Sequence, residues 1–324
     1  MADERVLVGD VGGTHARFAI VDTSQEPFGI VQHQEIEARE AGSFQAALKT
    51  YLDGIGGERP SAAAIAVAGP VTNGKVHFTN SGWEISEQEL HAAGFSRALL
   101  INDFAALAYS VTALPETAFH TIGPQLDGLA DEPITIVGAG TGFGVSCLAR
   151  YRGRAVPVAT EGGHMGFAPC GDDQIAVLRV LAKRFGHVSI ERMVSGPGLE
   201  NIYSALEEIA GRNSPALAAE DISTRAAGGD AACRAAQDMF CSVYGAVAGD
   251  FALAHGARGG VFIAGGIAAK IESYLRRSNF RAAFEAKGRL SSFVKPIPTK
   301  LIVEPNAAFF GAAYASLEFS GGPK

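Results

Sequence analysis

The feature that most constrains the fold of this chain is a glycine-rich turn between two apolar strands, which occurs twice. The first copy covers Val6 to Asp22 and reads VLVGDVGGTHARFAIVD, and the second covers Val137 to Cys147 and reads VGAGTGFGVSC. The copies begin about 130 residues apart, which is the size of a domain and too long for the repeat of one small structural unit. The repetition therefore predicts two related α/β halves, each with its own turn.

Each turn is suited to binding a phosphate. Glycine lets the backbone turn tightly and approach an anion, so the amide N–H groups around Gly12, Gly13 and Thr14 can converge on it. Asp10, at the end of the first strand, would then be positioned to hold a hydrated magnesium ion beside the phosphates. The alternative is an ordinary hairpin turn in which Asp10 bonds its own backbone. The second copy favours the phosphate interpretation, because two such hairpins facing each other across a cleft would grip one nucleotide tail.

Size and charge narrow the class of protein. A chain of 324 residues is too long for one ordinary core, so two domains are expected. A hydrophobic content of 47% with 19% charged residues is typical of a soluble globular protein. The formal net charge of −7 disfavours nucleic acid and anionic membranes as main partners, so a bound anion must be held by local amides and cations.

The cysteines and the N-terminus predict a reduced, cytoplasmic protein. The four cysteines form neither a CxxC pair nor a zinc-finger spacing, and the N-terminus does not resemble a signal peptide. The longest apolar run, from Phe240 to Ala254, is interrupted by Tyr244 and Asp250, so it is too short and too polar to span a bilayer. It is expected instead to form the buried middle of a long helix.

Apolar periodicity predicts strands and helices in a similar order in both halves, as βββαβαβ layers with helices on their faces. The expected strands are 5–10, 16–22, 30–38, 61–68, 74–79, 98–102, 134–138, 143–150, 154–159, 260–264 and 299–303. The expected helices are 43–53, 86–93, 103–112, 173–186, 197–211, 230–255, one after Ile267, and a closing helix from Asn306 to Leu317 that is apolar on one face. The segment from Leu114 to Pro133, rich in proline, glycine and acids, indicates a nearby domain boundary.

An acid stands where a strand meets a helix. In the segment LLIND, Leu99 to Asp103, the carboxylate emerges at the carboxyl end of a buried strand, which is where open α/β layers bind ligands. The alternative is an N-cap, in which Asn102 or Asp103 accepts from the first helix amides. The residues alone favour the cap.

Six motifs together resemble those of one family. GDVGGTHAR, INDF, GAGTGFG, EGGH, ERMVSGPGL and GGVFIAGGI occur in the order and at about the spacing found in bacterial glucokinases of the hexokinase, actin and Hsp70 superfamily. The resemblance covers nearly the whole chain, from Val6 to about Ala315. Unlike relatives with a zinc-binding cysteine cluster, this chain has only Cys170 in the corresponding region, so no structural zinc is implied.

The resemblance implies an α/β fold of two related ribonuclease H-like domains, the actin-like ATPase or hexokinase fold, with a cleft between them. It implies a small α/β domain formed by residues 1–112 and 304–324, and a large α/β domain formed by residues 113–303. It further implies a cytoplasmic homodimer.

The resemblance also implies ATP-dependent phosphorylation of D-glucose to glucose 6-phosphate, a step of glycolysis. Asp103 matches the general base, and the sugar contacts match Asn102, Asp103, Glu161, His164 and Glu191. The residues expected to bind ATP or ADP are Gly9, Asp10, Val11, Gly12, Gly13, Thr14, Gly138, Gly140, Thr141, Gly142, Gly265 and Gly266. Asp10 is expected to hold Mg²⁺ through water, and the SGPG segment from Ser195 to Gly198 is expected to begin a helix near the nucleotide.

Each of these residues also has a plainer interpretation. Glu161 could be a loop acid, His164 a core histidine, and Glu191 a solvated residue beside Arg192. The SGPG segment is adequately explained as a capped helix start. A sugar needs carboxylates, amides and imidazoles for its hydroxyl groups, and this favours the sugar interpretation of the first three.

Two residues depart from the family pattern. His15 stands where these glucokinases usually have asparagine, and a histidine can titrate near physiological pH. Thr160 precedes EGGH where a small residue is usual, and its side chain is expected to point elsewhere. Two other functions remain open: a related hexose kinase with another sugar or phosphoryl donor, and, less favoured, a non-catalytic sugar sensor.

Overall fold

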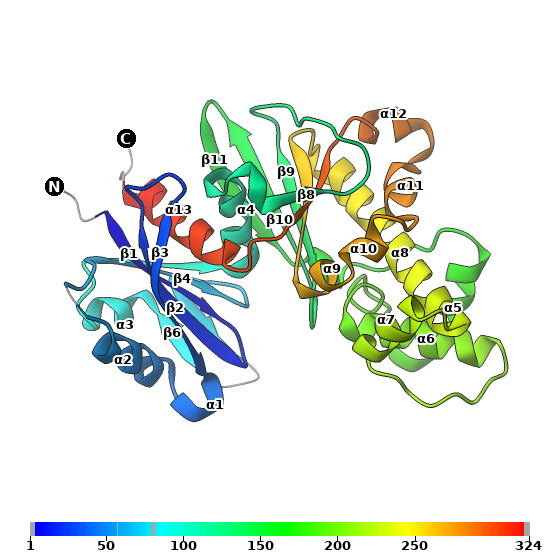
Figure 1. Cartoon of the computed structure of the whole chain (residues 1–324), viewed down its shortest axis with the longest axis horizontal. Coiled ribbons are helices and arrows are strands. Elements are labelled where there is room, and N and C mark those ends of the chain that lie inside the picture. The colour runs from blue at the N-terminus through cyan, green and yellow to red at the C-terminus, as the bar shows by residue number, and fades with distance from the viewer. Residues whose placement is uncertain (1–3, 57, 79–81, 321–324) are drawn as a thin grey trace. The chain divides into compact units, whose positions relative to one another are not determined.

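The computed structural model describes residues 4–56, 58–78 and 82–320. Contacts between Cα atoms divide the chain into two compact units. Unit 1 comprises Met1–Ala118 with Glu304–Lys324, and unit 2 comprises Phe119–Val303. The chain therefore leaves unit 1, completes unit 2, and returns to unit 1 (Figure 1).

Unit 1 is built on a five-stranded sheet in the order β3-β2-β1-β4-β7. Its strands are β1 (Arg5–Val11), β2 (His15–Asp22), β3 (Gly29–Glu37), β4 (Ala62–Val67) and β7 (Arg97–Asn102). β1, β2 and β3 pair antiparallel, whereas β4 pairs parallel with both β1 and β7. A small separate ribbon joins β5 (Lys75–His77) and β6 (Glu84–Ser86).

Helices cover both faces of this sheet, and successive side chains of β1 point to opposite faces. Leu7 and Val11 pack with the helix side chains Phe44 and Leu90, whereas Val6 packs with α13 on the other face. The helices of unit 1 are α1 (Ala38–Ala41), α2 (Phe44–Gly54), α3 (Glu87–Ala92), α4 (Asp103–Ala113), η1 (Glu116–Ala118) and α13 (Ala307–Ser320).

The closing helix α13 was expected to be apolar on one face, but this is wrong. From Ala307 to Ser316 every residue except Tyr314 is buried, because the helix lies between the sheet and α4. Helix α4 approaches so closely at Gly311 that a Cβ atom there would lie 1.7 Å from the Ala106 carbonyl oxygen. Gly311 is therefore required for the packing of the two helices.

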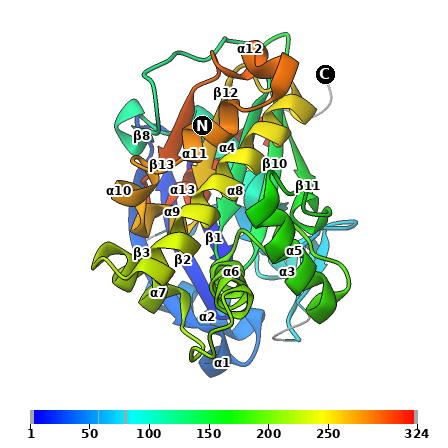
Figure 2. The same cartoon turned by 90° about the vertical axis from the view of Figure 1, so that its right-hand side faces the viewer.

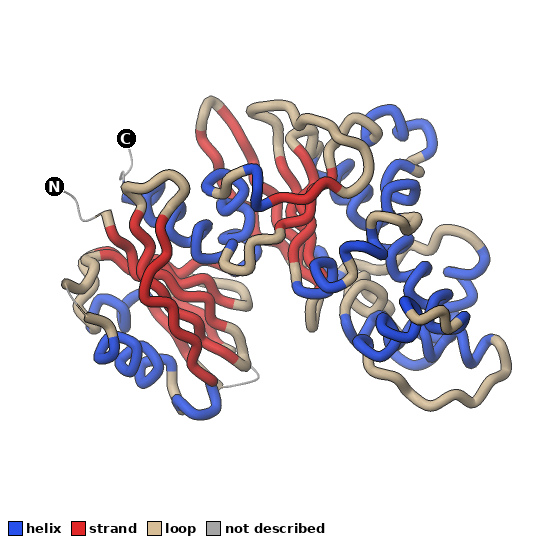
Figure 3. The backbone as a smooth tube through the Cα atoms, viewed as in Figure 1, coloured by secondary structure: helices blue, strands red, loops and turns tan. Residues whose placement is uncertain are grey.

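Unit 2 is built on a six-stranded sheet in the order β11-β10-β9-β12-β13-β8 (red strands, Figure 3). Its strands are β8 (Phe119–Thr121), β9 (Ile134–Ala139), β10 (Phe143–Tyr151), β11 (Arg154–Thr160), β12 (Gly260–Ala264) and β13 (Thr299–Ile302). Three antiparallel strands are again followed by two parallel ones, with β8 added antiparallel at the edge. Apart from β8, the strand order follows the same pattern as in unit 1.

The long helix α8 (Ala231–His255) organises the core of unit 2. It packs along α6, α7 and α11 (Figure 2), and it also contacts β9. Its fully buried Tyr244 meets the rings of Phe143, Phe240 and Phe280 edge-on. The other helices are η2 (Gly162–His164), α5 (Asp172–Phe185), α6 (Gly196–Ile209), α7 (Ala219–Ala227), α9 (Gly266–Lys270), α10 (Glu272–Leu275), α11 (Phe280–Glu285), η3 (Gly288–Leu290) and α12 (Ser291–Val294).

Most predicted elements are present within a few residues of their expected bounds, and the differences concern short segments. The sequence interpretation missed β6, β8, α1, α7 and the short helices between α9 and β13. The strand expected over 74–79 is shorter and extends from Lys75 to His77, since residues 74 and 78 lie outside it, and residue 79 lies outside the described residues. No helix among the described residues is long and apolar enough to cross a membrane.

Candidate active site

The first glycine turn joins β1 to β2 and is closed by its own backbone. The amide of Gly12 donates to the carbonyl of His15 at 2.9 Å, and Gly13 and Thr14 are exposed. Gly9 and Val11 lie in the core, and a Cβ atom at Gly9 would stand 2.8 Å from the Ile65 side chain. A side chain at Gly9 would thus press on Ile65, and Val11 can offer a ligand only its backbone.

Asp10 is held by an arginine that the sequence interpretation did not single out. Asp10 and Arg17 are opposite each other in the β1–β2 register, and Arg17 Nη2 forms an ion pair with Asp10 Oδ2. Arg17 also donates to the Pro305 carbonyl at 3.3 Å and lies 5.5 Å from the centre of the Phe309 ring. Arg17 thus links the carboxylate beside the first turn to the start of α13.

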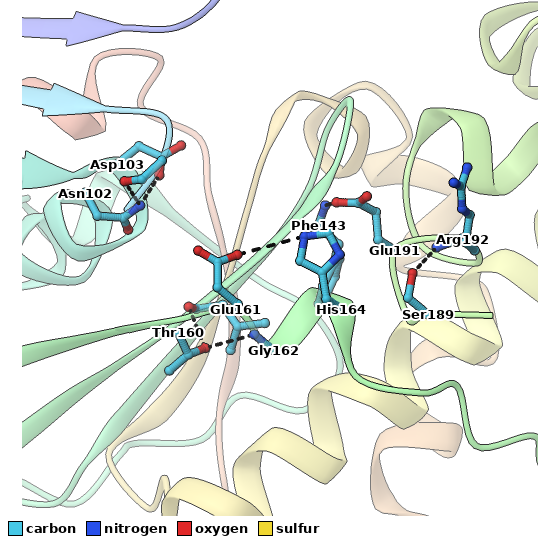
Figure 4. A network of polar contacts seen from close by, with 12 residues as sticks. Asn102, Asp103, Phe143, Thr160, Glu161, Gly162, His164, Ser189, Glu191 and Arg192 are labelled. Atoms are coloured by element: carbon cyan, nitrogen blue, oxygen red, sulfur yellow. Dashed lines mark hydrogen bonds and ion pairs between the residues drawn. The ribbon is translucent and has the colours of Figure 1, made fainter. Parts of the chain in front are cut away.

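Both interpretations of the LLIND segment apply, to different residues. Asn102 is the N-cap of α4, and its Oδ1 accepts from the amides of Phe104 and Ala105 at 3.0 and 3.1 Å. Asp103 Oδ1 accepts from Phe104 N–H and from Asn102 Nδ2, each at 2.9 Å (Figure 4). Asn102 therefore both caps the helix and orients the Asp103 carboxylate.

Amides at the start of a helix favour the ionised form of an aspartate, but at Asp103 burial outweighs them. Desolvation and, to a smaller extent, the nearby charge of Asp10 together raise the pKa of Asp103 to about 7. The hydrogen bonds from Phe104 and Asn102 lower the pKa but do not outweigh the loss of water. Asp103 consequently changes protonation state near neutral pH.

The second glycine turn joins β9 to β10 and is held by a hydrogen bond from the start of another helix. Gly140 N–H donates to the Gly142 carbonyl at 2.9 Å, and the Gly140 carbonyl accepts from Gly196 N–H at 2.9 Å. Gly196 is the first residue of α6, whose N-cap Ser195 accepts from Gly198 N–H. The predicted SGPG cap is therefore real, and it also holds the turn.

The turn between β12 and α9 packs against the end of β9, where the second glycine turn begins. Gly265 has a φ of +89°, and a Cβ atom there would stand 2.3 Å from the Ala139 carbonyl oxygen, whereas Gly266 has open space around it. Unit 2 therefore brings together three segments predicted to bind the nucleotide. These segments are 138–142, 195–198 and 265–266.

The EGGH segment forms η2 and keeps two polar side chains accessible. Glu161 Oε2 lies 3.9 Å from His164 Nε2, and these side chains are 68% and 63% exposed (Figure 4). This exposure argues against His164 being a core histidine. The two glycines let the segment pack, because Cβ atoms would stand 2.8 Å from Phe251 at Gly162 and 2.0 Å from the Phe143 carbonyl at Gly163.

Thr160 has a larger role than the sequence interpretation assigned to it. Its hydroxyl donates to the Val145 carbonyl at 3.1 Å and accepts from Gly162 N–H at 3.2 Å. The carbonyl of His164 lies 3.0 Å from Nε2 of His187. These contacts fix both ends of η2.

Glu191 is not a solvated residue beside Arg192. Its amide donates to the Gly163 carbonyl at 2.9 Å, and its Oε2 accepts from Phe143 N–H at 3.0 Å (Figure 4). The Arg192 guanidinium instead lies over the Phe185 ring, 4.3 Å from its centre. Glu161, His164 and Glu191 are thus gathered on adjoining segments of unit 2, while Asn102 and Asp103 belong to unit 1.

Comparison with known proteins decides the family. The glucokinase family model matches residues 7–318. A glucokinase of Caulobacter sp. (strain K31) is 47% identical over 95% of this chain and 94% of the relative. The chain belongs to the glucokinase family. This confirms the family predicted from the six motifs, and with it the prediction of a kinase that phosphorylates glucose.

Solved structures confirm the class of fold. The crystal structure of a glucokinase from an Antarctic psychrotroph is 36% identical, with a TM-score of 0.90, and the match covers 97% of this chain and 99% of that one. A ROK family glucokinase from Streptomyces griseus, solved with glucose and AMPPNP, is 18% identical with a TM-score of 0.66, covering 97% and 99% of the two chains. The chain therefore has the α/β fold of these sugar kinases.

Proposed function

We propose that this member of the glucokinase family transfers the γ-phosphoryl group of ATP to the 6-hydroxyl group of D-glucose, with Asp103 as general base. The observation that carries the proposal is the Asp103 carboxyl group itself. It stands at the carboxyl end of β7, it is oriented by Asn102, and its pKa is raised to about 7. A base whose pKa lies near the working pH is effective in taking a proton.

The hydrogen bonds at Asp103 give its two carboxylate oxygens different roles. Oδ1 accepts from Asn102 and Phe104, so we assign proton acceptance to Oδ2. As the sugar oxygen attacks phosphorus, its proton passes to Oδ2 while the bond between the γ-phosphorus and the bridging oxygen of ATP breaks. Catalysis of phosphoryl transfer rests mainly on positioning and on charge stabilisation, so Asp103 need supply only this proton transfer.

The proposed sugar contacts have the chemistry that hydroxyl groups require. Glu161 and His164 are exposed on η2, and Glu191 adjoins them through its backbone bond to Gly163. Carboxylates accept from sugar hydroxyls, and an imidazole can donate or accept. Together with Asn102 and Asp103, these side chains favour glucose over an apolar ligand.

The proposed donor site consists of backbone groups. Gly140, Gly196 and Gly265 lie on three segments that contact one another through 2.9 Å hydrogen bonds or close packing. Such turns and helix starts suit phosphate groups. The Streptomyces griseus relative was solved with an ATP analogue, and this supports ATP as donor.

A magnesium ion fits the acids of unit 1. The charge of Asp10 acts on the Asp103 carboxyl group, and Mg²⁺ prefers oxygen ligands and keeps much of its water. We propose that Asp10 holds the ion through water, with Arg17 fixing the carboxylate. When bound, the ion would neutralise phosphate charge.

A coupled assay across hexoses and nucleotides tests the proposal. We expect turnover with glucose and ATP to exceed that with mannose, fructose, GTP or polyphosphate. A preference for another pair would favour the related hexose kinase, and glucose binding without turnover would favour the sensor. Omission of magnesium, with EDTA present, is expected to abolish turnover.

The finer architecture and assembly are also proposals. We propose two related ribonuclease H-like domains, residues 1–112 with 304–324 and residues 113–303, with a sugar-binding cleft between them, and a cytoplasmic homodimer. The corresponding strand orders of the two units support the first, and the family resemblance supports the second. A smaller radius of gyration with glucose, and a dimer in sedimentation, are the expected results.

A further inference from the structure

Glu191 is the residue at which the proposed sugar segment and the proposed donor turn of unit 2 meet. Its amide donates to the Gly163 carbonyl of the EGGH segment at 2.9 Å. Its side chain reaches the other way, and Oε2 accepts from the amide of Phe143 at 3.0 Å. Phe143 is the residue that follows the turn at 140–142, so one residue connects both segments.

The Glu191 carboxylate occupies the space of a missing side chain. A Cβ atom at Gly142 would stand 2.5 Å from Glu191 Oε2, whereas a Cβ atom at Gly140 meets nothing within 4 Å. Neither glycine has a positive φ, so backbone strain does not require glycine at position 142. Gly142 therefore makes room for Glu191.

The backbone around Glu191 also holds the other end of the turn. The Ser195 hydroxyl donates to the Glu191 carbonyl at 2.7 Å, and the next amide, Gly196 N–H, donates to the Gly140 carbonyl at 2.9 Å. The segment 191–196 thus contacts the turn at Gly140 and at Phe143. Movement of the Glu191 side chain would release only the second contact.

We propose that Glu191 is a positioning residue for the donor turn as well as a sugar contact. This inference rests on the proposed function. Oε2 holds the Phe143 amide in a charge-assisted hydrogen bond, and Oε1 accepts from a sugar hydroxyl. A turn that is already ordered loses less entropy when the nucleotide binds. Because a sugar on Oε1 would immobilise the same carboxylate, glucose strengthens nucleotide binding and the nucleotide strengthens glucose binding.

Calorimetric titration of the sugar-free enzyme with ADP separates the two roles of Glu191. We expect Glu191→Ala to weaken ADP binding by about 5- to 30-fold, because the nucleotide loses only the part of the hydrogen bond's free energy that orders the turn. Glu191→Gln keeps an oxygen that can accept from Phe143 N–H, so ADP affinity should be retained while the KM for glucose rises. The matched control is Glu161→Ala, whose side chain pairs with His164, and it should leave ADP affinity unchanged.

Hydrogen exchange at the Phe143 amide gives a direct readout. We expect faster exchange in Glu191→Ala, and protection close to that of the unmodified chain in Glu191→Gln. If Glu191→Ala does not fold, as judged by its thermal transition, Glu191→Asp replaces it. The shorter side chain keeps the charge but withdraws the carboxylate, so the same loss of ADP affinity is expected.

Three results would overturn the proposal. The first is unchanged ADP affinity in Glu191→Ala with glucose binding lost, which would leave the proposed function intact. The second is an equal loss in Glu161→Ala. The third is tighter ADP binding in both Glu191→Ala and Glu191→Gln, which would mean that the carboxylate repels phosphate. Failure of the unmodified chain to phosphorylate glucose would refute the proposed function, whereas the ADP titration would still decide the role of Glu191 at the turn.

Discussion

The two glycine turns look alike in sequence but differ in the side chains that surround them. Each turn has a backbone hydrogen bond of its own, and each is also held by a neighbouring segment, the first through Ala38 N–H on the Thr14 carbonyl at 2.9 Å. The charged groups near the first turn are Asp10, Arg17 and Asp103. The second turn is held through Gly196 and Glu191. We infer that charge dominates the chemistry of the first unit and that close packing dominates the second. Substitutions that change the charge of a side chain without its volume, or its volume without its charge, should show which property matters in each unit.

The largest effect is expected from a change of charge in unit 1. Asp103→Asn keeps the size of the side chain and its acceptor for Phe104 N–H, but removes the basic oxygen. Turnover should fall by about 10²- to 10⁴-fold, the usual contribution of a general base. Glucose should still bind, as measured by its Kd alongside kcat. Near-normal turnover would remove Asp103 from the mechanism.

The pH dependence of the reaction should report the same carboxyl group. Because desolvation raises the pKa of Asp103 to about 7, the base is progressively protonated below that pH. We expect kcat/KM for glucose to fall about tenfold per pH unit below pH 7. A profile that stays flat down to pH 5 would contradict the raised pKa.

The free energy of unfolding should depend on pH in the opposite direction to kcat/KM. A carboxyl group with a folded pKa above its unfolded value favours the folded state when protonated, so its contribution is lost as pH rises from about 4 to 7. Asp103→Asn should therefore melt at a higher temperature than the unmodified chain at pH 8. The difference should disappear below pH 4, where the group is protonated in both states.

A larger side chain in the glycine turn of unit 2 should have an effect of intermediate size on ligand binding. The sequence alone suggests that a side chain at Gly142 would weaken ATP binding and spare glucose, but its contact with Glu191 changes this expectation. We expect Gly142→Ala to weaken both ligands by about 3- to 10-fold, since it displaces a charge-assisted hydrogen bond. Gly140→Ala, on the same turn, has open space and should weaken only the nucleotide. Equal effects of the two variants on glucose would argue against this role of Glu191.

The smallest effect is expected from a charge that unit 2 uses for structure. Glu207 is buried on α6 and pairs with Arg212 and Ser214, whose hydrogen bonds hold the pKa of Glu207 below its ordinary value. Glu207→Gln should lower stability at pH 7 by about 1 to 3 kcal/mol, measured by denaturant unfolding. The loss should shrink as pH falls through the folded pKa, and catalysis should not change.

Local patterns in the sequence were sufficient for the main strands and long helices. The continuous apolar run of β1 and the buried run of α8 depend on neighbouring residues, so they can be read along the chain. β8 could not be predicted, because three residues at 119–121 become a strand only by pairing with β13, far away in sequence. The short helices between α9 and β13 have too few turns to show a period.

The sequence predicted the types of residue in the candidate site, but not the contacts that these residues make. Glu191 is 48 positions from Phe143, and no local pattern links them. Arg17 was overlooked although its place opposite Asp10 follows from a hairpin register, which was a usable signal. The direction of the Asp103 pKa shift depends on how far the folded chain removes the carboxyl group from water, which no single segment reveals.

The contact between α13 and α4 has a consequence for biosynthesis. The ribosome makes α4, with Asp103 at its start, well before α13, and the whole of unit 2 is translated in between. Until Gly311 arrives against Ala106, the face of β1 that carries Val6 and Val8 lacks its cover. Unit 2 can therefore fold without α13, whereas the unit that carries the proposed base cannot complete its core until a later segment arrives, and a released chain that ends at residue 303 should be protease-resistant only in unit 2.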